Sequence, residues 1–91
     1  MKIKEQYILR HIADEWLLMP VGAEVVTARR AIVLDNVAAF IVEHLKAPSS
    51  REELIQAIVG EYNVLPDIAG KDLDELLQKL NEFGVIDSLA G

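Results

Sequence analysis

Acidic side chains are the most numerous chemically active groups of this chain, and many lie in its last third. The carboxylates beside a run of leucines there are Asp72, Asp74, Glu75 and Glu82. A pair of such groups could carry out general acid–base catalysis. Charges opposite an apolar helical stripe are more typical of a solvated face, and Glu75 is four residues from both Lys71 and Lys79, which favours local ion pairs. The sequence therefore predicts a charged surface here, without catalysis.

Other groups that could support catalysis, metal binding or nucleotide binding are few and isolated. The chain has no cysteine, which excludes disulfides, thiolate zinc sites, iron–sulfur clusters and a cysteine nucleophile. The serines, Ser49, Ser50 and Ser88, are at positions typical of helix caps or of a chain end. His11 and His44 lack the spacing that places two ligands on one helix face, and the glycines do not cluster into a phosphate-binding loop. The residues therefore give no support for nucleophilic catalysis, a metal site or nucleotide binding.

The length and composition predict a single domain over residues 1–91. A chain of 91 residues can fill one hydrophobic core but not two, and its 52% hydrophobic content is near that of globular proteins. No apolar run reaches the ~18 residues of a membrane-spanning helix, and the sequence does not open as a secretory signal does. We expect a cytoplasmic protein with no membrane partner.

Charge is unevenly distributed along the chain. The formal net charge is −6, with five basic and four acidic residues in residues 1–34 but four basic and eleven acidic residues in residues 35–91. An acidic second half repels phosphate backbones, so the sequence disfavours a nucleic-acid partner.

Three short strands are predicted within about residues 5–34. Residues 7–12 alternate between two faces with the period of a strand. Residues 16–21 are rich in apolar side chains and follow a short break at residues 13–15, which indicates an antiparallel hairpin. Residues 31–34 are partly β-branched and form a third candidate strand, which we expect at the edge of the sheet.

Three helices are predicted within about residues 35–84. Asp35 is placed as the N-cap of the first helix, which should end near Lys46. The second should end near residues 60–62. Its start fits a capping box, in which a serine and a glutamate three residues later each bond the other's backbone N–H. The two possible pairs are Ser49 with Glu52 and Ser50 with Glu53.

The third helix is predicted to be the longest, from Pro66 in its first turn to Gly84 at its C-cap. Its apolar stripe consists of Leu73, Leu76, Leu77, Leu80 and Phe83. At 100° per residue Leu73, Leu77 and Leu80 share one face and Leu76 lies at its flank. Some of these leucines should therefore be core, and Leu76 is the one expected to line a groove. Residues 85–86 are expected to add a short strand or to pack against the helices.

The segment Arg29-Arg30-Ala31-Ile32-Val33-Leu34 joins a basic start to a short apolar strand. An outer strand of a three-stranded antiparallel sheet has N–H and C=O groups that seek partners. If the third helix lies beside this edge, strand and helix form a groove in which an extended peptide could add as a fourth strand. A short, solvated edge strand is the other interpretation, and the residue pattern alone favours it.

Several segments, taken in order and spacing, resemble one protein family across roughly residues 5–87. They are Tyr7-Ile8-Leu9-Arg10, Trp16-Leu17-Leu18-Met19-Pro20-Val21-Gly22, Ala31-Ile32-Val33-Leu34-Asp35-Asn36, Ala39-Phe40-Ile41, Arg51-Glu52-Glu53-Leu54, Glu61-Tyr62-Asn63-Val64, Asp72-Leu73 and Phe83-Gly84-Val85-Ile86. The chain resembles the coenzyme PQQ synthesis protein D (PqqD) family. It departs from the family at Leu34-Asp35-Asn36-Val37-Ala38, where relatives often have Leu-Asn-Glu-Thr-Gly.

This resemblance implies an α+β, winged-helix-like domain with a three-stranded antiparallel sheet followed by three helices. Members of the family are non-catalytic recognition elements that act as peptide chaperones in PQQ biosynthesis and other peptide-modification pathways. They bind the leader segment of a ribosomally made precursor peptide and deliver it to a modifying enzyme. That enzyme is often a radical S-adenosylmethionine protein or, in lasso-peptide pathways, a leader peptidase. The resemblance implies no bound cofactor.

The leader site of the family is the groove between the third strand and the third helix. Carried over to this chain, it consists of Arg30, Ala31, Ile32, Val33, Leu34, Leu73, Leu76, Leu77 and Leu80. The resemblance therefore points to the same edge as the strand argument. Within this site we expect Arg30 to steer acidic leader residues toward the groove.

Two other functions compete with leader binding. Winged-helix folds often bind DNA, but a recognition helix should present basic or amide side chains, whereas residues 67–83 contain five acidic residues against two lysines. A transcription regulator is therefore the alternative. The second competitor is a dimerisation module that pairs its own sheet edges.

Overall fold

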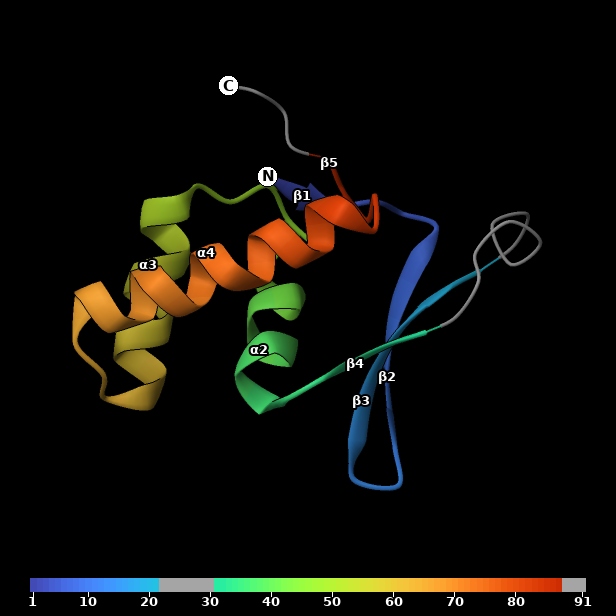
Figure 1. Ribbon diagram of the computed structural model, residues 1–91, viewed down its shortest axis with the longest axis horizontal. Coiled ribbons are helices and arrows are strands. Elements are labelled where there is room, and N and C mark those ends of the chain that lie inside the picture. The colour runs from blue at the N-terminus through green and yellow to red at the C-terminus, as the bar shows by residue number, and fades with distance from the viewer. Residues whose placement is uncertain (22–30, 88–91) are drawn as a thin grey trace.

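The computed structural model describes residues 1–21 and 31–87, which form an α+β fold (Figure 1). The elements in chain order are β1 (Lys2–Ile3), β2 (Tyr7–Ile12), β3 (Glu15–Pro20), β4 (Ile32–Leu34), α2 (Asn36–His44), α3 (Arg51–Tyr62), α4 (Pro66–Glu82) and β5 (Ile86–Asp87). Strands β2, β3 and β4 form a three-stranded antiparallel sheet, and the three helices follow it in the chain. This order confirms the predicted fold class.

A two-residue turn joins β2 to β3. Its residues, Ala13 and Asp14, have φ angles of 48° and 66°. Two-residue turns of this left-handed kind match the twist of the strands that they connect. Beside the turn the rings of His11 and Trp16 stack across the two strands, with centroids 4.2 Å apart. The predicted break at residues 13–15 is therefore one residue too long.

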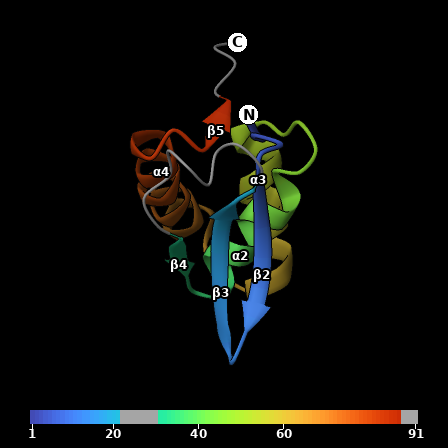
Figure 2. The same cartoon turned by 90° about the vertical axis from the view of Figure 1, so that its right-hand side faces the viewer.

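Strand β4 is an outer strand of the sheet, as predicted (Figure 2). It pairs with β3 through Leu18 and Ile32, and no strand among the described residues pairs with its other side. Its side chains alternate, because Ile32 and Leu34 are buried whereas Val33 is 55% exposed. The strand thus contributes to the core with one face and keeps an unpaired backbone edge.

Side chains cap the first two helices. The Asp35 carboxylate accepts a hydrogen bond from the backbone N–H of Ala38 at 2.8 Å. Of the two predicted capping boxes, the one between Ser50 and Glu53 forms, with bonds of 2.8 and 3.1 Å. Ser49 instead donates its hydroxyl to two upstream backbone carbonyls. Both helix starts therefore have partners for N–H groups that the helix leaves unsatisfied.

Helix α4 is the longest described helix, with 17 residues. Pro66 occupies its first turn, where the missing N–H has no cost. Beyond its end, Gly84 has a φ of +70°, a conformation that glycine adopts without strain. Gly70 does not interrupt the helix. No helix among the described residues is long and apolar enough to cross a membrane.

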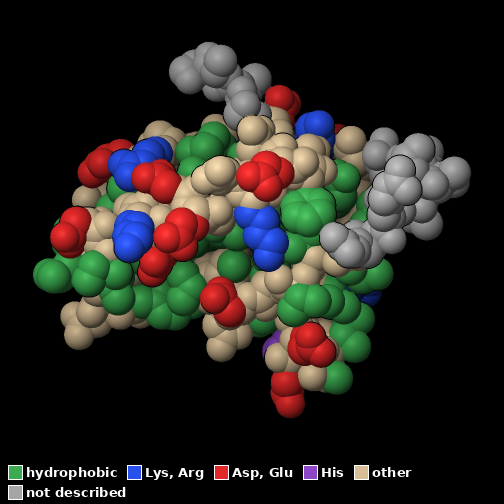
Figure 3. Space-filling model, viewed as in Figure 1, with side chains coloured by type: hydrophobic (Ala, Val, Ile, Leu, Met, Phe, Trp, Pro, Cys, Tyr) green, Lys and Arg blue, Asp and Glu red, His purple; other side chains and the backbone are tan. Residues whose placement is uncertain are grey.

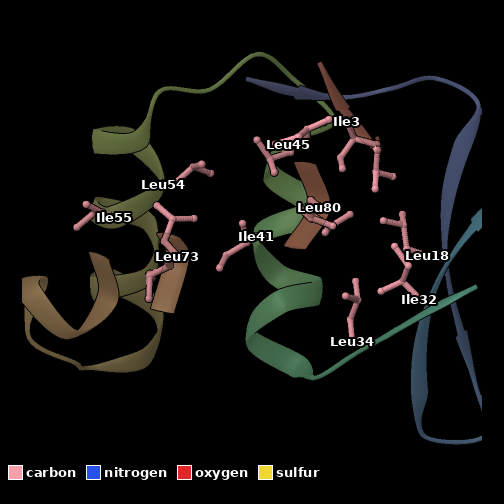
Figure 4. Close-up of a cluster of buried hydrophobic side chains, with 14 of the residues drawn as sticks. Ile3, Leu18, Ile32, Leu34, Ile41, Leu45, Leu54, Ile55, Leu73 and Leu80 are labelled. Carbon is pink, nitrogen blue, oxygen red and sulfur yellow. The ribbon is translucent and has the colours of Figure 1, made fainter. Parts of the chain in front are cut away.

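The hydrophobic core lies where the sheet meets the helices (Figure 4). Leu18 and Ile32 of the sheet face Leu80 of α4, while Leu54 of α3 faces Leu73 (Figure 4). The side chains with no exposed surface are Leu45, Leu73, Leu80 and Val85. Leu73 and Leu80 of α4 therefore pack entirely within the core.

The chain ends of the described fold pair with each other. Ile3 of β1 lies opposite Ile86 of β5 in a two-stranded antiparallel ladder, and both side chains are buried. The sequence suggested a strand or helix packing at residues 85–86, and both occur, because Val85 is fully buried and Ile86 is paired. The partner strand at residues 2–3 was not predicted, because two residues are too few to show the alternation of side chains that marks a strand.

We expect Leu80→Ala to lower the free energy of unfolding by about 2–5 kcal/mol, because it leaves a cavity among fully buried side chains. Leu65→Ala is the matched control, since Leu65 is 63% exposed and the change should stay within about 0.5 kcal/mol. Urea denaturation of the two variants measures both effects. Equal destabilisation by the two substitutions would contradict the assigned core.

Candidate functional site

A groove lies between the outer strand β4 and helix α4, closed on a third side by the start of α2. Its volume is about 400 Å³. The lining residues are Val33, Leu34, Asp35, Val37, Ala38, Ile41, Asp72, Glu75, Leu76 and Lys79. We call this hollow the β4–α4 groove.

The β4–α4 groove has an apolar floor and a charged rim. Leu34 and Ile41 are buried at its base, and Leu76 is half-buried. The charged lining residues, all exposed, are Asp35, Asp72, Glu75 and Lys79. Figure 3 looks onto the face that α4 and β4 share, where hydrophobic side chains lie between acidic and basic ones. Such a surface can hold an apolar side chain and contact polar groups on either side of it.

The structure places the predicted strand residues in different environments. Val33 and Leu34 line the β4–α4 groove, whereas the side chain of Ile32 is buried in the core. Ala31 is half-buried and does not line the groove. Arg30 lies outside the described residues. The open backbone edge of β4 and two of its side chains therefore face this space.

The four predicted leucines of α4 divide between core and groove. Leu73 and Leu80 have no exposed surface and belong to the core. Leu77 is half-buried and packs against the core without lining the groove. Leu76 lines the groove, at the flank where the helical geometry predicted it. Its role in binding stays a prediction.

Helix α2 contributes groove residues that the sequence did not indicate. Val37, Ala38 and Ile41 were not among the predicted site residues, although they form the third side of the groove. The only available signal was their closeness in the chain to Leu34. The turn at Asp35 carries the chain directly from the strand into this helix, so strand end and helix start must be neighbours.

Hydrogen bonds from two other elements hold the start of α2. The indole N–H of Trp16 on β3 donates to the side-chain oxygen of Asn36 at 3.1 Å. The hydroxyl of Tyr62 on α3 donates to the backbone carbonyl of the same residue at 3.4 Å. Asn36 thus links this side of the groove to the sheet and to α3.

An ion pair joins α4 to α3. The Arg51 guanidinium donates two hydrogen bonds to the Asp74 carboxylate, each 2.8 Å long. Gly70 makes room for this contact, because a Cβ there would lie 3.0 Å from the Arg51 Nη2. The paired guanidinium holds the pKa of the Asp74 carboxyl below its usual value, and the carboxylate raises the pKa of Arg51.

The ion pairs predicted within α4 do not form. Among the described residues, the ion pairs are Lys2–Glu5, Lys46–Glu43 and Arg51–Asp74. Glu75 is therefore paired with neither Lys71 nor Lys79. Glu75 and Lys79 both lie at the rim of the β4–α4 groove.

Two other hollows differ from the β4–α4 groove in chemistry. The one between α3 and α4 has a volume of about 690 Å³ but is crossed by the Arg51–Asp74 pair and lies away from the open strand edges. The other, of about 540 Å³, lies along β2 and is basic. Its charged residues are Lys2, Lys4, Glu5, Arg10 and Lys46. In the part of the chain that the structure describes, no cluster of His, Asp and Glu is arranged to hold a metal ion.

Comparison with family models settles the family. The model described as coenzyme PQQ synthesis protein D (PqqD) matches residues 15–86. The chain belongs to the PqqD family. The match includes β3, β4 and all three described helices, and it begins later than the resemblance predicted from residue 5. A search of curated proteins finds no match.

A solved structure resembles this PqqD-family chain over its whole length. It is described as TbiB1 in complex with the TbiA(beta) leader peptide. The two chains are 28% identical, the TM-score is 0.79, and the alignment covers 100% of each chain. The likeness therefore extends to the strands and helices that surround the β4–α4 groove.

We expect the pKa of Asp74 in this PqqD-family protein to be below its usual value of about 3.9, and Arg51→Ala to return it there. Because the folded-state pKa is the lower one, the stabilisation is complete above the usual pKa and is lost as the pH falls through the folded value. Carboxyl ¹³C NMR titration of both proteins measures the shift. An Asp74 pKa that Arg51→Ala does not change would contradict the ion pair.

Proposed function

We propose that this PqqD-family chain is a non-catalytic binding module that captures the leader segment of a ribosomally made precursor peptide. The observation that carries the proposal is the outer edge of β4, with which no strand of the described ranges pairs, beside a groove with an apolar floor. Membership in the PqqD family and similarity to TbiB1, which was solved with a leader peptide, support it.

In this proposal the leader adds to β4 as a fourth strand. The backbone N–H and C=O groups of β4 that do not face β3 supply main-chain hydrogen bonds. Alternate side chains of the leader then point toward the β4–α4 groove, because the side-chain period of a strand is two. An apolar leader side chain fills the space above Leu34, Ile41 and Leu76, which provides affinity and selects the sequence.

In this proposal a partner enzyme, and not this chain, catalyses the modification of the precursor peptide. A captured leader holds the rest of the precursor close to that enzyme, which raises its effective concentration without catalysis by this chain. The enzyme is of the radical S-adenosylmethionine class or is a leader peptidase. The proposal requires no cofactor, nucleic acid or membrane as partner of this chain.

Helix α4 supports peptide over DNA as the ligand. It carries five acidic side chains against Lys71 and Lys79, so it repels a phosphate backbone. The acidic residues are Asp67, Asp72, Asp74, Glu75 and Glu82. A winged-helix regulator would need the opposite charge on this helix.

We expect the protein to bind the leader peptide of a precursor encoded beside its gene with a Kd of about 1 μM or lower. Leu76→Ala should weaken binding by about fivefold or more, because the half-buried leucine is in the groove floor, and should leave the fold intact. Leu65→Ala is the control, since this exposed leucine does not line the groove. Isothermal titration calorimetry measures each Kd, with circular dichroism to verify folding.

Two results of that titration would refute the proposal. One is salt-sensitive binding of duplex DNA without any binding of leader peptide. The other is equal leader affinity in the folded Leu76→Ala and Leu65→Ala proteins, which would place the peptide elsewhere.

Strand addition makes a further prediction about the leader itself. N-methylation of successive leader residues should alternate in effect, because only every second N–H of an added strand faces β4. A methylated residue that faces β4 loses a hydrogen bond worth about 0.5–1.5 kcal/mol, or roughly twofold to twelvefold in Kd. Fluorescence polarisation with a labelled leader measures the series. A uniform effect along the leader, with no alternation, would contradict strand addition.

A further inference from the structure

The charged residues of the β4–α4 groove are predominantly acidic. Three carboxylates line it, from Asp35, Asp72 and Glu75, against the single ammonium group of Lys79. Asp35 is partly engaged as the N-cap of α2, which still leaves two carboxylates against one ammonium. Among the described residues, neither Asp72 nor Glu75 has a cation within 4 Å.

Among residues 1–21 and 31–87, the basic side chains that line a hollow of the sheet gather along its opposite edge. The hollow along β2 holds four basic residues and one acidic residue. In the strand order β2-β3-β4, this hollow and the β4–α4 groove flank opposite outer strands. The described charges of the β4–α4 groove therefore complement a basic peptide, whereas those of the hollow along β2 complement an acidic one.

The spacing on α4 matches that of an extended peptide. Asp72, Leu76 and Lys79 follow each other at intervals of four and three residues, so they form one stripe with successive members about 5–6 Å apart. Side chains on one face of a strand repeat every two residues, or about 6.6 Å. In Figure 1, β4 lies below α4 and has about the same direction across the view, so an added strand on the α4 side of β4 would follow this stripe.

We propose that the chain prefers leader segments in which a basic residue lies two positions from the apolar side chain that fills the groove. The apolar side chain contacts Leu76, and the basic one faces Asp72 and Glu75. This inference rests on the proposed function, since it specifies the peptide that the same groove takes. It differs from the expectation of an acidic leader steered by Arg30, because the charged side chains that line the groove are mostly acidic.

The test begins with selection from a display library of random peptides about twelve residues long. An extended peptide of this length is several times longer than β4, so it can place different residues beside the strand. Selected peptides that lose affinity for Leu76→Ala are groove binders. In these we expect Lys or Arg two positions from an apolar residue. For each, a version with Glu at the basic position is synthesised, and both Kd values are measured.

On the wild-type protein the basic version should bind about tenfold more tightly than the acidic version in about 50 mM salt, since exposed charge pairs contribute up to about fivefold each. The ratio should fall toward one in about 1 M salt, where the Debye length is about 3 Å. Glu75→Lys, or Asp72→Lys as a second variant, should remove or reverse the preference. Glu61→Lys makes the same charge change at an exposed site of α3 outside the groove and should leave it unaltered.

The outcomes separate this inference from the function on which it rests. Groove binders with equal affinity for the basic and acidic versions would overturn the charge preference and leave leader capture standing. An equal loss of preference in Glu75→Lys and Glu61→Lys would also overturn it, because net charge alone would then be responsible. A library that yields no peptide dependent on Leu76 would overturn the proposed function, and this inference with it.

Discussion

The burial of one stripe of α4 is the constraint on which the rest of the structure depends. Leu73 packs toward α3 and Leu80 toward the sheet, and neither retains exposed surface. Hydrophobic burial of this extent fixes both the position of the helix and its rotation about its axis. With these two leucines buried, the flank of the same stripe faces the space beside β4, which Leu76 and Glu75 line.

Polar contacts make this arrangement specific. The hydrogen bonds between Arg51 and Asp74 tie α4 to α3, and those of Trp16 and Tyr62 tie the start of α2 to its neighbours. These are surface contacts, whose contribution to stability is modest compared with core packing. Their effect is on geometry, because they hold α4 and the start of α2, two sides of the β4–α4 groove, against α3 and β3.

The short outer strand β4 combines a buried face with an accessible backbone edge. Ile32 and Leu34 hold β4 in the core, while Val33 and one row of backbone groups remain accessible. An exposed strand edge is an aggregation hazard in most proteins, and a length of three residues limits it. The same edge is the one to which the proposed leader would add as a strand, beside a groove whose rim is mostly acidic.

The sequence by itself determined the elements and much of their capping. Period-two and helical patterns, Asp35, Pro66 and Gly84 correctly predicted the three-stranded sheet and the three helices, since these signals are local. Only the tertiary structure decided which leucines of α4 are core and that α2 forms one side of the groove. It also decided that the ion pair of α4 joins Asp74 to Arg51 of α3, and not Glu75 to a lysine of the same helix. Those facts depend on how elements distant in the chain pack together, and neither residue type nor spacing along one helix specifies the partner on another.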